Sequence, residues 1–186
     1  RVGANIDINI AKGLTFHGDY TRSILNYISN GVTLPVYVAN WWSSYSPKYA
    51  LVSSNQVSKT IVKTRANAFN AYFDYNVDLA KDHNLAVKLG FNSDDYFTQT
   101  IGATAKTMFN YDFPVLSLTE NASNATVSES KSKRAAAGFF GRINYNWKDK
   151  LLVELNGRFD GSSKFAAGQK WGFFPSASVG YRLSEE

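Results

Sequence analysis

The feature that most constrains the fold is a strict alternation of apolar and polar residues near the C-terminal end. In the run LLVELNGRFD (151–160), apolar side chains alternate with polar ones. The run from 171 to 183 repeats the pattern, with Phe174 as the one large apolar residue on its polar side. Because successive side chains of a β-strand point to opposite faces, this period of two predicts half-buried strands.

The length of these runs points to a membrane-spanning wall. Each is about as long as the roughly 9–11 tilted residues with which a strand crosses a bilayer, and each has an aromatic residue near an apolar end. No run approaches the roughly 18 consecutive apolar residues of a membrane helix, so a spanning structure has to be a β-barrel. The absence of cysteine excludes a disulfide framework and a thiolate metal site.

The same alternation recurs upstream and predicts seven strands in all. The connections alternate between short ones, near residues 12, 80 and 148, and longer ones, 26–60, 93–133 and 160–170. Short periplasmic turns and long outer loops are typical of outer-membrane barrels. The predicted fold is therefore all-β: an antiparallel up-and-down transmembrane β-barrel fragment, about seven strands of a larger barrel in a curved open sheet.

This strand direction assigns a place to the aromatic and polar side chains. Aromatic residues are expected at the two membrane interfaces. The inner set is Tyr145, Trp147 and Tyr181, and the outer set is Phe165, Trp171 and Phe173. The polar face is expected to line the lumen with Asp74, Lys88, Arg142, Glu154, Arg158 and Asp160. Arg158 and Asp160 project to the same side, and we expect them to join an ion network.

Two motifs on neighbouring strands carry a family resemblance. They comprise Asp160, Gly161, Ser162, Ser163, Lys164 and Phe165, followed by Phe174, Pro175 and Ser176. As a spaced pair they resemble the C-terminal barrel portion of SusC/RagA-type TonB-linked outer-membrane receptors. The resemblance covers about the last quarter of the chain, and Lys164 stands where the family usually has arginine.

The resemblance implies a function as well as a fold. It implies a barrel of about 22 strands with a plugged lumen, in the bacterial outer membrane, that imports oligosaccharides or peptides with energy from TonB and the proton-motive force. It also implies a SusD-like surface lipoprotein as partner, no enzymatic activity and no cofactor. We expect residues 1–186 to be a partial barrel domain, without the plug and the remaining strands. The alternative is a soluble carbohydrate-binding β-sandwich module.

Four aromatic residues in the first long connection are candidate ligand contacts: Trp41, Trp42, Tyr45 and Tyr49. Their flat apolar faces and polar edges suit stacking on sugar rings. The alternative is packing within the loop or against the lipoprotein.

The remaining candidate chemistry is weak. The Asp-Gly-Ser-Ser segment has the residues of a turn, and we favour that structural role over a metal or phosphate loop. His17 and His83 lack the companions of a metal site, and no catalytic set stands out. The formal charge of +5 is scattered, so no nucleic-acid partner is predicted. The chain begins at Arg1, and we expect it to be a fragment of a longer protein.

Overall fold

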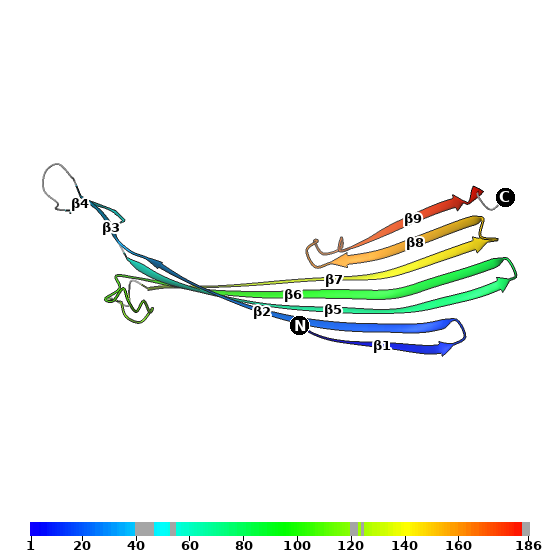
Figure 1. The fold of residues 1–186 in the computed structure, drawn as a ribbon, viewed down its shortest axis with the longest axis horizontal. Helices are drawn as coiled ribbons and strands as arrows, with labels where there is room; N and C mark the ends of the chain where they lie inside the picture. The colour runs from blue at the N-terminus through cyan, green and yellow to red at the C-terminus, as the bar shows by residue number, and fades with distance from the viewer. Residues whose placement is uncertain (40–46, 53–54, 120–122, 124, 184–186) are drawn as a thin grey trace. The chain divides into compact units, whose positions relative to one another are not determined.

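The computed structural model describes residues 1–39, 47–52, 55–119, 123 and 125–183. Seven strands form one sheet in the order β1-β2-β5-β6-β7-β8-β9 (Figure 1). They are β1 (Val2–Ala11), β2 (Leu14–Thr33), β5 (Gln56–Ala80), β6 (His83–Lys106), β7 (Ala125–Trp147), β8 (Leu151–Ser162) and β9 (Trp171–Tyr181). A separate two-stranded sheet contains β3 (Val36–Ala39) and β4 (Pro47–Val52). The predicted all-β, up-and-down architecture of seven strands is confirmed.

No helix among the described residues is long and apolar enough to cross a membrane. The chain divides into two compact units. Unit 1 comprises residues 1–24, 65–97 and 133–186, and unit 2 comprises residues 25–64 and 98–132. Strands β2, β5, β6 and β7 contribute residues to both units.

The three predicted short connections are confirmed, and they lie at the same end of unit 1 (Figure 1). Gly13 turns the chain between β1 and β2 with a φ of 79°, a conformation in which a side chain would be strained. Backbone hydrogen bonds join the turns to a neighbouring strand and to each other: Asn76 N on β5 donates to Gly13 O at 2.8 Å, and Lys148 N donates to Asp82 O of the next turn at 2.8 Å. These bonds satisfy turn groups that would otherwise need water.

The predicted long connections were too long. Strand β2 continues to Thr33, β3 and β4 lie inside the segment, and β5 already begins at Gln56, so most of the described part of 26–60 is strand. Likewise β6 reaches Lys106 and β7 begins at Ala125, within the predicted loop 93–133. Strands form wherever neighbouring backbones pair, whereas alternation appears only where the two faces meet different surroundings. Polar residues occupy both faces of these extensions, so the period-two signal is lost there.

The third long connection was also shorter than predicted. Strand β8 runs to Ser162, so residues 160–162 pair with β7 and lie outside the turn, which spans 163–170. Gly161 lies opposite Ala137 and Trp171 in the two neighbouring strands. The first three residues of the Asp-Gly-Ser-Ser motif are therefore strand, and Ser163 begins the turn.

Unit 2 contains a small buried cluster of Val57, Ala105 and Met108. Asn55 is also buried, at 7% exposure. Its Nδ2 donates to the Met108 carbonyl oxygen at 3.2 Å, and its Oδ1 accepts from the Met108 backbone N–H at 2.7 Å. This side chain therefore replaces strand pairing where β6 ends, near Thr107 with its φ of 63°.

Unit 1 instead exposes its large apolar side chains. Among the described residues, the buried hydrophobic side chains are Val57, Ala105 and Met108, all in unit 2. In unit 1, Ile6 is 53% exposed and Phe139 is 54% exposed. A sheet face of this kind needs an apolar surrounding, because exposing large apolar area to water is unfavourable.

Candidate functional site

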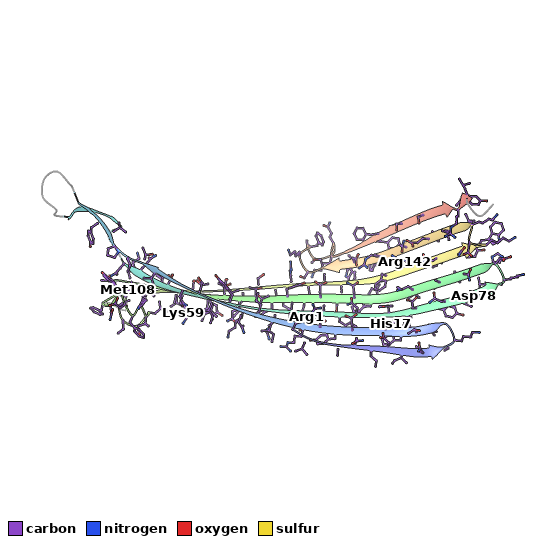
Figure 2. The ribbon with its side chains drawn as sticks, in the orientation of Figure 1. Arg1, His17, Lys59, Asp78, Met108 and Arg142 are labelled. Carbon is purple, nitrogen blue, oxygen red and sulfur yellow. The ribbon has the colours of Figure 1, made fainter. Side chains whose placement is uncertain are left out.

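The sheet of unit 1 has two chemically different sides. Cross-strand pairs such as Asp7 with His17 and Asn156 with Ser176 lie on one side, which we call the polar face. Pairs such as Ile8 with Phe16 lie on the other, which we call the apolar face. His17 on β2 and Arg142 on β7 both belong to the polar face, and Figure 2 labels their positions. The polar face is the candidate functional site.

The first cluster of the polar face runs across β1, β2, β5 and β6. Asp7 Oδ1 lies 2.6 Å from His17 Nδ1, and the His17 ring stacks on Tyr72 with centroids 4.7 Å apart. Lys88 Nζ lies 4.6 Å from the centroid of the Tyr72 ring and 2.9 Å from Asp74 Oδ2. Tyr72 thus carries a histidine on one side and an ammonium group over its ring, which its electron-rich face attracts.

The second cluster lies around Arg158 on β8. Its Nε and Nη2 donate to the two carboxylate oxygens of Asp160 at 3.1 and 2.8 Å. Nη2 also donates to Asn92 Oδ1 at 3.1 Å, and the guanidinium lies 5.5 Å from the centroid of the Phe140 ring. A bidentate pair of this geometry fixes the orientation of both side chains.

Gly138 makes room for this cluster. A Cβ atom there would collide with Asp160 Oδ1 and would lie 3.2 Å from both Arg158 Nη2 and Asn92 Oδ1. Gly90 plays a similar part on β6, because a Cβ atom there would collide with the Phe140 ring and lie 2.6 Å from the Tyr72 Cβ. Two glycines therefore let large side chains lie flat across the polar face.

A third group completes the set of predicted polar residues. Arg142 Nε donates to Asn156 Oδ1 at 2.7 Å, and Asn156 Nδ2 donates to Glu154 Oε1 at 2.7 Å. The structure thus brings the six predicted polar residues into three groups: Asp74 with Lys88, Arg142 with Glu154 through Asn156, and Arg158 with Asp160.

Two hollows mark this face. One, of about 490 Å³, is bordered by Asn92, Arg158, Asp160, Phe165, Lys170 and Phe174. The other, of about 740 Å³, lies toward the short turns and is bordered by residues that include Asn76, Asp78, Asn84, Asn144, Asn146 and Glu154. Figure 2 labels Asp78 at that end. Both offer hydrogen-bonding groups beside apolar side chains, which is the composition of a binding surface.

The chemistry of these groups is that of binding. The described residues contain no group of three or more His, Asp or Glu side chains placed to hold a metal ion. Charged, amide and aromatic groups dominate, so the face can hydrogen-bond and stack on a polar ligand.

The motif residues hold the end of β8 in place. Ser163 N donates to Ala135 O at 2.8 Å, and Ser163 Oγ accepts from Ala135 N at 2.9 Å. Ser162 N donates to Lys170 O at 3.0 Å across the turn. The two Ser163 bonds join the β8–β9 turn to β7, and the Ser162 bond closes the turn, which is a structural role.

The second motif lies on β9 beside β8. Phe174 lies opposite Arg158, Pro175 opposite Gly157 and Ser176 opposite Asn156. Phe174 and Phe165 are 60% and 62% exposed and border the smaller hollow. Motif residues thus also contribute aromatic surface to the polar face.

The aromatic ligand candidates are mostly outside the described residues. Trp41, Trp42 and Tyr45 lie there, and Tyr49 is described as part of β4, opposite Val38. Their role in ligand contact stays a prediction.

Aromatic side chains also cross the apolar face. The ring centroids of Phe69 and Phe91 are 6.4 Å apart, those of Phe91 and Phe139 are 5.0 Å apart, and those of Phe139 and Trp171 are 6.4 Å apart. Trp171 also stacks on Phe159 at 5.0 Å. We call these five residues the aromatic row.

Near the short turns a second group forms, with His83 at 6.0 Å from Tyr145 and 6.4 Å from Trp147 between ring centroids. Aromatic residues therefore occur toward both ends of the apolar face in unit 1, as interface girdles do.

Sequence reasoning missed the contacts around Tyr72 and Phe140. Alternation tells on which side of its own strand a residue lies, and it places both Tyr72 and Phe140 on the polar side. The neighbours in adjacent strands depend on register, which alternation leaves open. The glycines opposite large side chains, Gly90 and Gly138, are a usable signal, because glycine within a strand often marks a close approach.

Comparison with known proteins identifies the family. The model of the TonB dependent receptor-like β-barrel matches residues 3–186. TonB-dependent receptor P26 of Formosa agariphila is 31% identical over 147 residues, which are 77% of this chain and 15% of that protein. TonB-dependent receptor SusC of Bacteroides thetaiotaomicron is 36% identical over 55 residues, which are 30% of this chain and 6% of that protein.

Solved structures agree in fold. The structure of the RagAB peptide transporter superposes with a TM-score of 0.82 at 19% identity, covering 95% of this chain and 19% of the other. The chain spans less than a fifth of the length of these relatives. The predicted resemblance and the prediction of a non-enzyme are both confirmed, since the relatives are receptors and transporters. The chain belongs to the β-barrel part of the TonB-dependent receptor family.

Proposed function

We propose that the protein carrying this chain is an outer-membrane transporter that imports oligosaccharides or peptides, energised through TonB and the proton-motive force. The observation that carries the proposal is the division of the unit 1 sheet into an exposed apolar face with aromatic residues toward both ends and a polar face of linked charged groups. A barrel wall between lipid and an aqueous lumen requires this division. The family match supports the same reading.

In this proposal residues 1–186 are one part of the barrel domain. The other strands and a plug belong to the rest of the receptor, since the relatives are several times longer. The polar face lines the lumen with Asp74, Lys88, Arg142, Glu154, Arg158 and Asp160. A SusD-like surface lipoprotein is the proposed partner at the outer end, in line with the similarity to SusC and to a RagAB structure.

The soluble β-sandwich is the weaker alternative. A sandwich packs a second sheet against the apolar face of the first. In the described residues of unit 1 all strands belong to one sheet, and its apolar side chains are exposed. The exposed face therefore favours lipid as its surrounding.

Uptake in the native bacterium tests the proposal. We expect deletion of the receptor gene to abolish uptake of either a fluorescent oligosaccharide or a fluorescent peptide, and complementation to restore it. Treatment with a protonophore should stop the same uptake in wild-type cells. Unchanged uptake of both probe classes in the deletion strain would refute import.

The aromatic segment of the first long connection has its own test. We propose that Trp41 and Trp42 contact the ligand, so a W41A/W42A receptor should bind it more weakly by calorimetry. The matched control is F113A, because Phe113 is another exposed aromatic, at 63% exposure, outside that segment. Equal affinities of wild type, W41A/W42A and F113A would contradict a ligand role for the pair.

A further inference from the structure

Three cations extend the apolar face of unit 1 beyond its aromatic residues. They are Arg22 on β2, Arg65 on β5 and Lys133 on β7, and all three are exposed. We propose that they form a binding site for the phosphate groups of membrane lipids, which we call the cation row. This proposal rests on the proposed membrane location and adds a lipid partner to it.

Strand periodicity places the three cations on the apolar face. Arg22 lies opposite Val2 and is an even number of residues from Phe16. Arg65 lies four residues before Phe69, and Lys133 lies six residues before Phe139, so each shares a side with its aromatic residue. The Arg65 guanidinium lies 4.9 Å from the centroid of the Phe97 ring, which shares its side of β6 with Phe91.

The distance from the aromatic residues matches a lipid headgroup layer. Aromatic rings mark the border between hydrocarbon and headgroups. The cations follow Tyr20, Phe69 and Phe139 by two, four and six residues, in the direction away from the short turns. At about 3.3 Å per residue and a tilt of about 40°, this is roughly 5 to 15 Å along the membrane normal. Arginine and lysine side chains are long enough to reach back toward the border.

The charge of this surface is not neutralised within the described part of unit 1. None of the three cations forms an ion pair with a described carboxylate, whereas Lys88 and Arg158 on the polar face both do. The Phe97 ring orients the Arg65 guanidinium, and no described residue accepts a hydrogen bond from its N–H donors.

One carboxylate shares the surface. Both oxygens of Asp95 accept from Asn67 Nδ2 at 3.1 Å, and Asn67 Oδ1 accepts from the Tyr20 hydroxyl at 3.0 Å. The three cations and this carboxylate leave two positive charges uncompensated among the described residues there. An anion is therefore expected, and phosphate matches the fork of donors that arginine presents.

Lipid binding to the full-length receptor in detergent tests the site. The probes are lipid A with two phosphates and the same lipid A after enzymatic removal of both phosphates, and bound lipid is measured by native mass spectrometry. The test variant is R22Q/R65Q/K133Q. The matched control is K12Q/K81Q/K148Q, which removes the same charge at the short turns.

We expect each removed cation of the row to weaken binding of bisphosphorylated lipid A about fivefold at low salt, and the control to bind like wild type. Wild type should bind dephosphorylated lipid A as weakly as the triple variant binds bisphosphorylated lipid A. Equal binding of the phosphorylated lipid by wild type and triple variant would overturn the proposal. Full displacement of the lipid by millimolar inorganic phosphate would also overturn it, because the site would then recognise free phosphate.

Two further measurements separate the possible failures. R22K/R65K keeps the charge and loses the arginine fork, and it should retain binding within about threefold because charge supplies most of the attraction. This variant distinguishes loss of charge from loss of fold. Cell fractionation tests the membrane location by itself. A receptor absent from the outer membrane refutes the proposed function, whereas an outer-membrane receptor that is indifferent to lipid phosphate refutes only the cation row.

Discussion

Gly138 offers the sharpest test of the polar face, because it is the position at which one methyl group should disrupt the Arg158 cluster. In G138A the new Cβ atom would collide with Asp160 Oδ1 and press on Arg158 Nη2 and Asn92 Oδ1. Asp160 would have to move, and both of its hydrogen bonds from Arg158 would be lost.

The size of the effect follows from exposure. The side chains of Arg158 and Asp160 are 45% and 36% exposed, so solvent screens their attraction. We assign about 1–2 kcal/mol to the loss of the two bonds. Replacing a glycine within a strand by alanine by itself stabilises the folded state by roughly 0.5 kcal/mol or more. The net destabilisation should therefore be on the order of 1 kcal/mol.

A double-mutant cycle isolates this interaction. We expect G138A to destabilise the full-length receptor in guanidinium unfolding followed by tryptophan fluorescence. In the D160A background the same change should be neutral or slightly stabilising, because the colliding carboxylate is gone. The coupling between the two sites should be about 1–2 kcal/mol. The matched control is G180A, whose Cβ atom would meet Leu152 Cβ at an ordinary 3.8 Å.

An equal loss of stability from G138A with and without Asp160 would refute a collision with the Asp160 carboxylate. A G180A variant as destabilised as G138A would refute it too, since the effect would then belong to any glycine of the sheet.

Three further perturbations test other parts of the chain. G161A should destabilise the receptor by about 1–2 kcal/mol and shift its tryptophan emission, because the new Cβ atom would lie 2.6 Å from the Trp171 ring; an unchanged emission spectrum would be inconsistent with that contact. N55A should speed hydrogen exchange of the Met108 amide, because Asn55 bonds both Met108 backbone groups. The free energy of local opening should fall by about 1–3 kcal/mol, and unaltered exchange would show that the side chain is dispensable. K88M should cost less than about 1 kcal/mol in thermal unfolding and should cost less still in high salt, because the Lys88–Asp74 pair is partly exposed; a large, salt-independent loss would contradict this.

The sequence predicts the parts of the fold that local pattern controls. Alternation in 151–160 and 171–183 reports on two unlike surroundings, so it identified strands and their faces. The short turns follow from the same pattern, since each separates two alternating runs.

The outer ends of the strands were missed because their backbones pair without an alternation of apolar and polar side chains. Residues 125–134 read ATVSESKSKR and have polar side chains on both faces, yet they form strand β7 because their backbones pair with a neighbour. No face preference exists in such a segment, so periodicity cannot detect it.

The sequence predicts on which face of the sheet each site residue lies, but it predicts only some of the contacts between these residues. Arg158 and Asp160 are two residues apart on one strand, so their pairing follows from strand geometry alone. The stack of His17 on Tyr72 joins β2 to β5, and its existence depends on which of many registers the strands adopt.

A spin-label scan of β8 tests most directly whether this chain is a membrane barrel wall. The chain contains no cysteine of its own, so single cysteines can be placed and labelled in turn from 151 to 160. In the full-length receptor in a lipid bilayer, labels at 153, 155 and 159 should collide more with oxygen, and labels at 154, 156 and 158 more with a water-soluble nickel complex. We expect the two accessibilities to alternate with a period of two along β8. A scan without alternation, or one in which the two sets are exchanged, would contradict it.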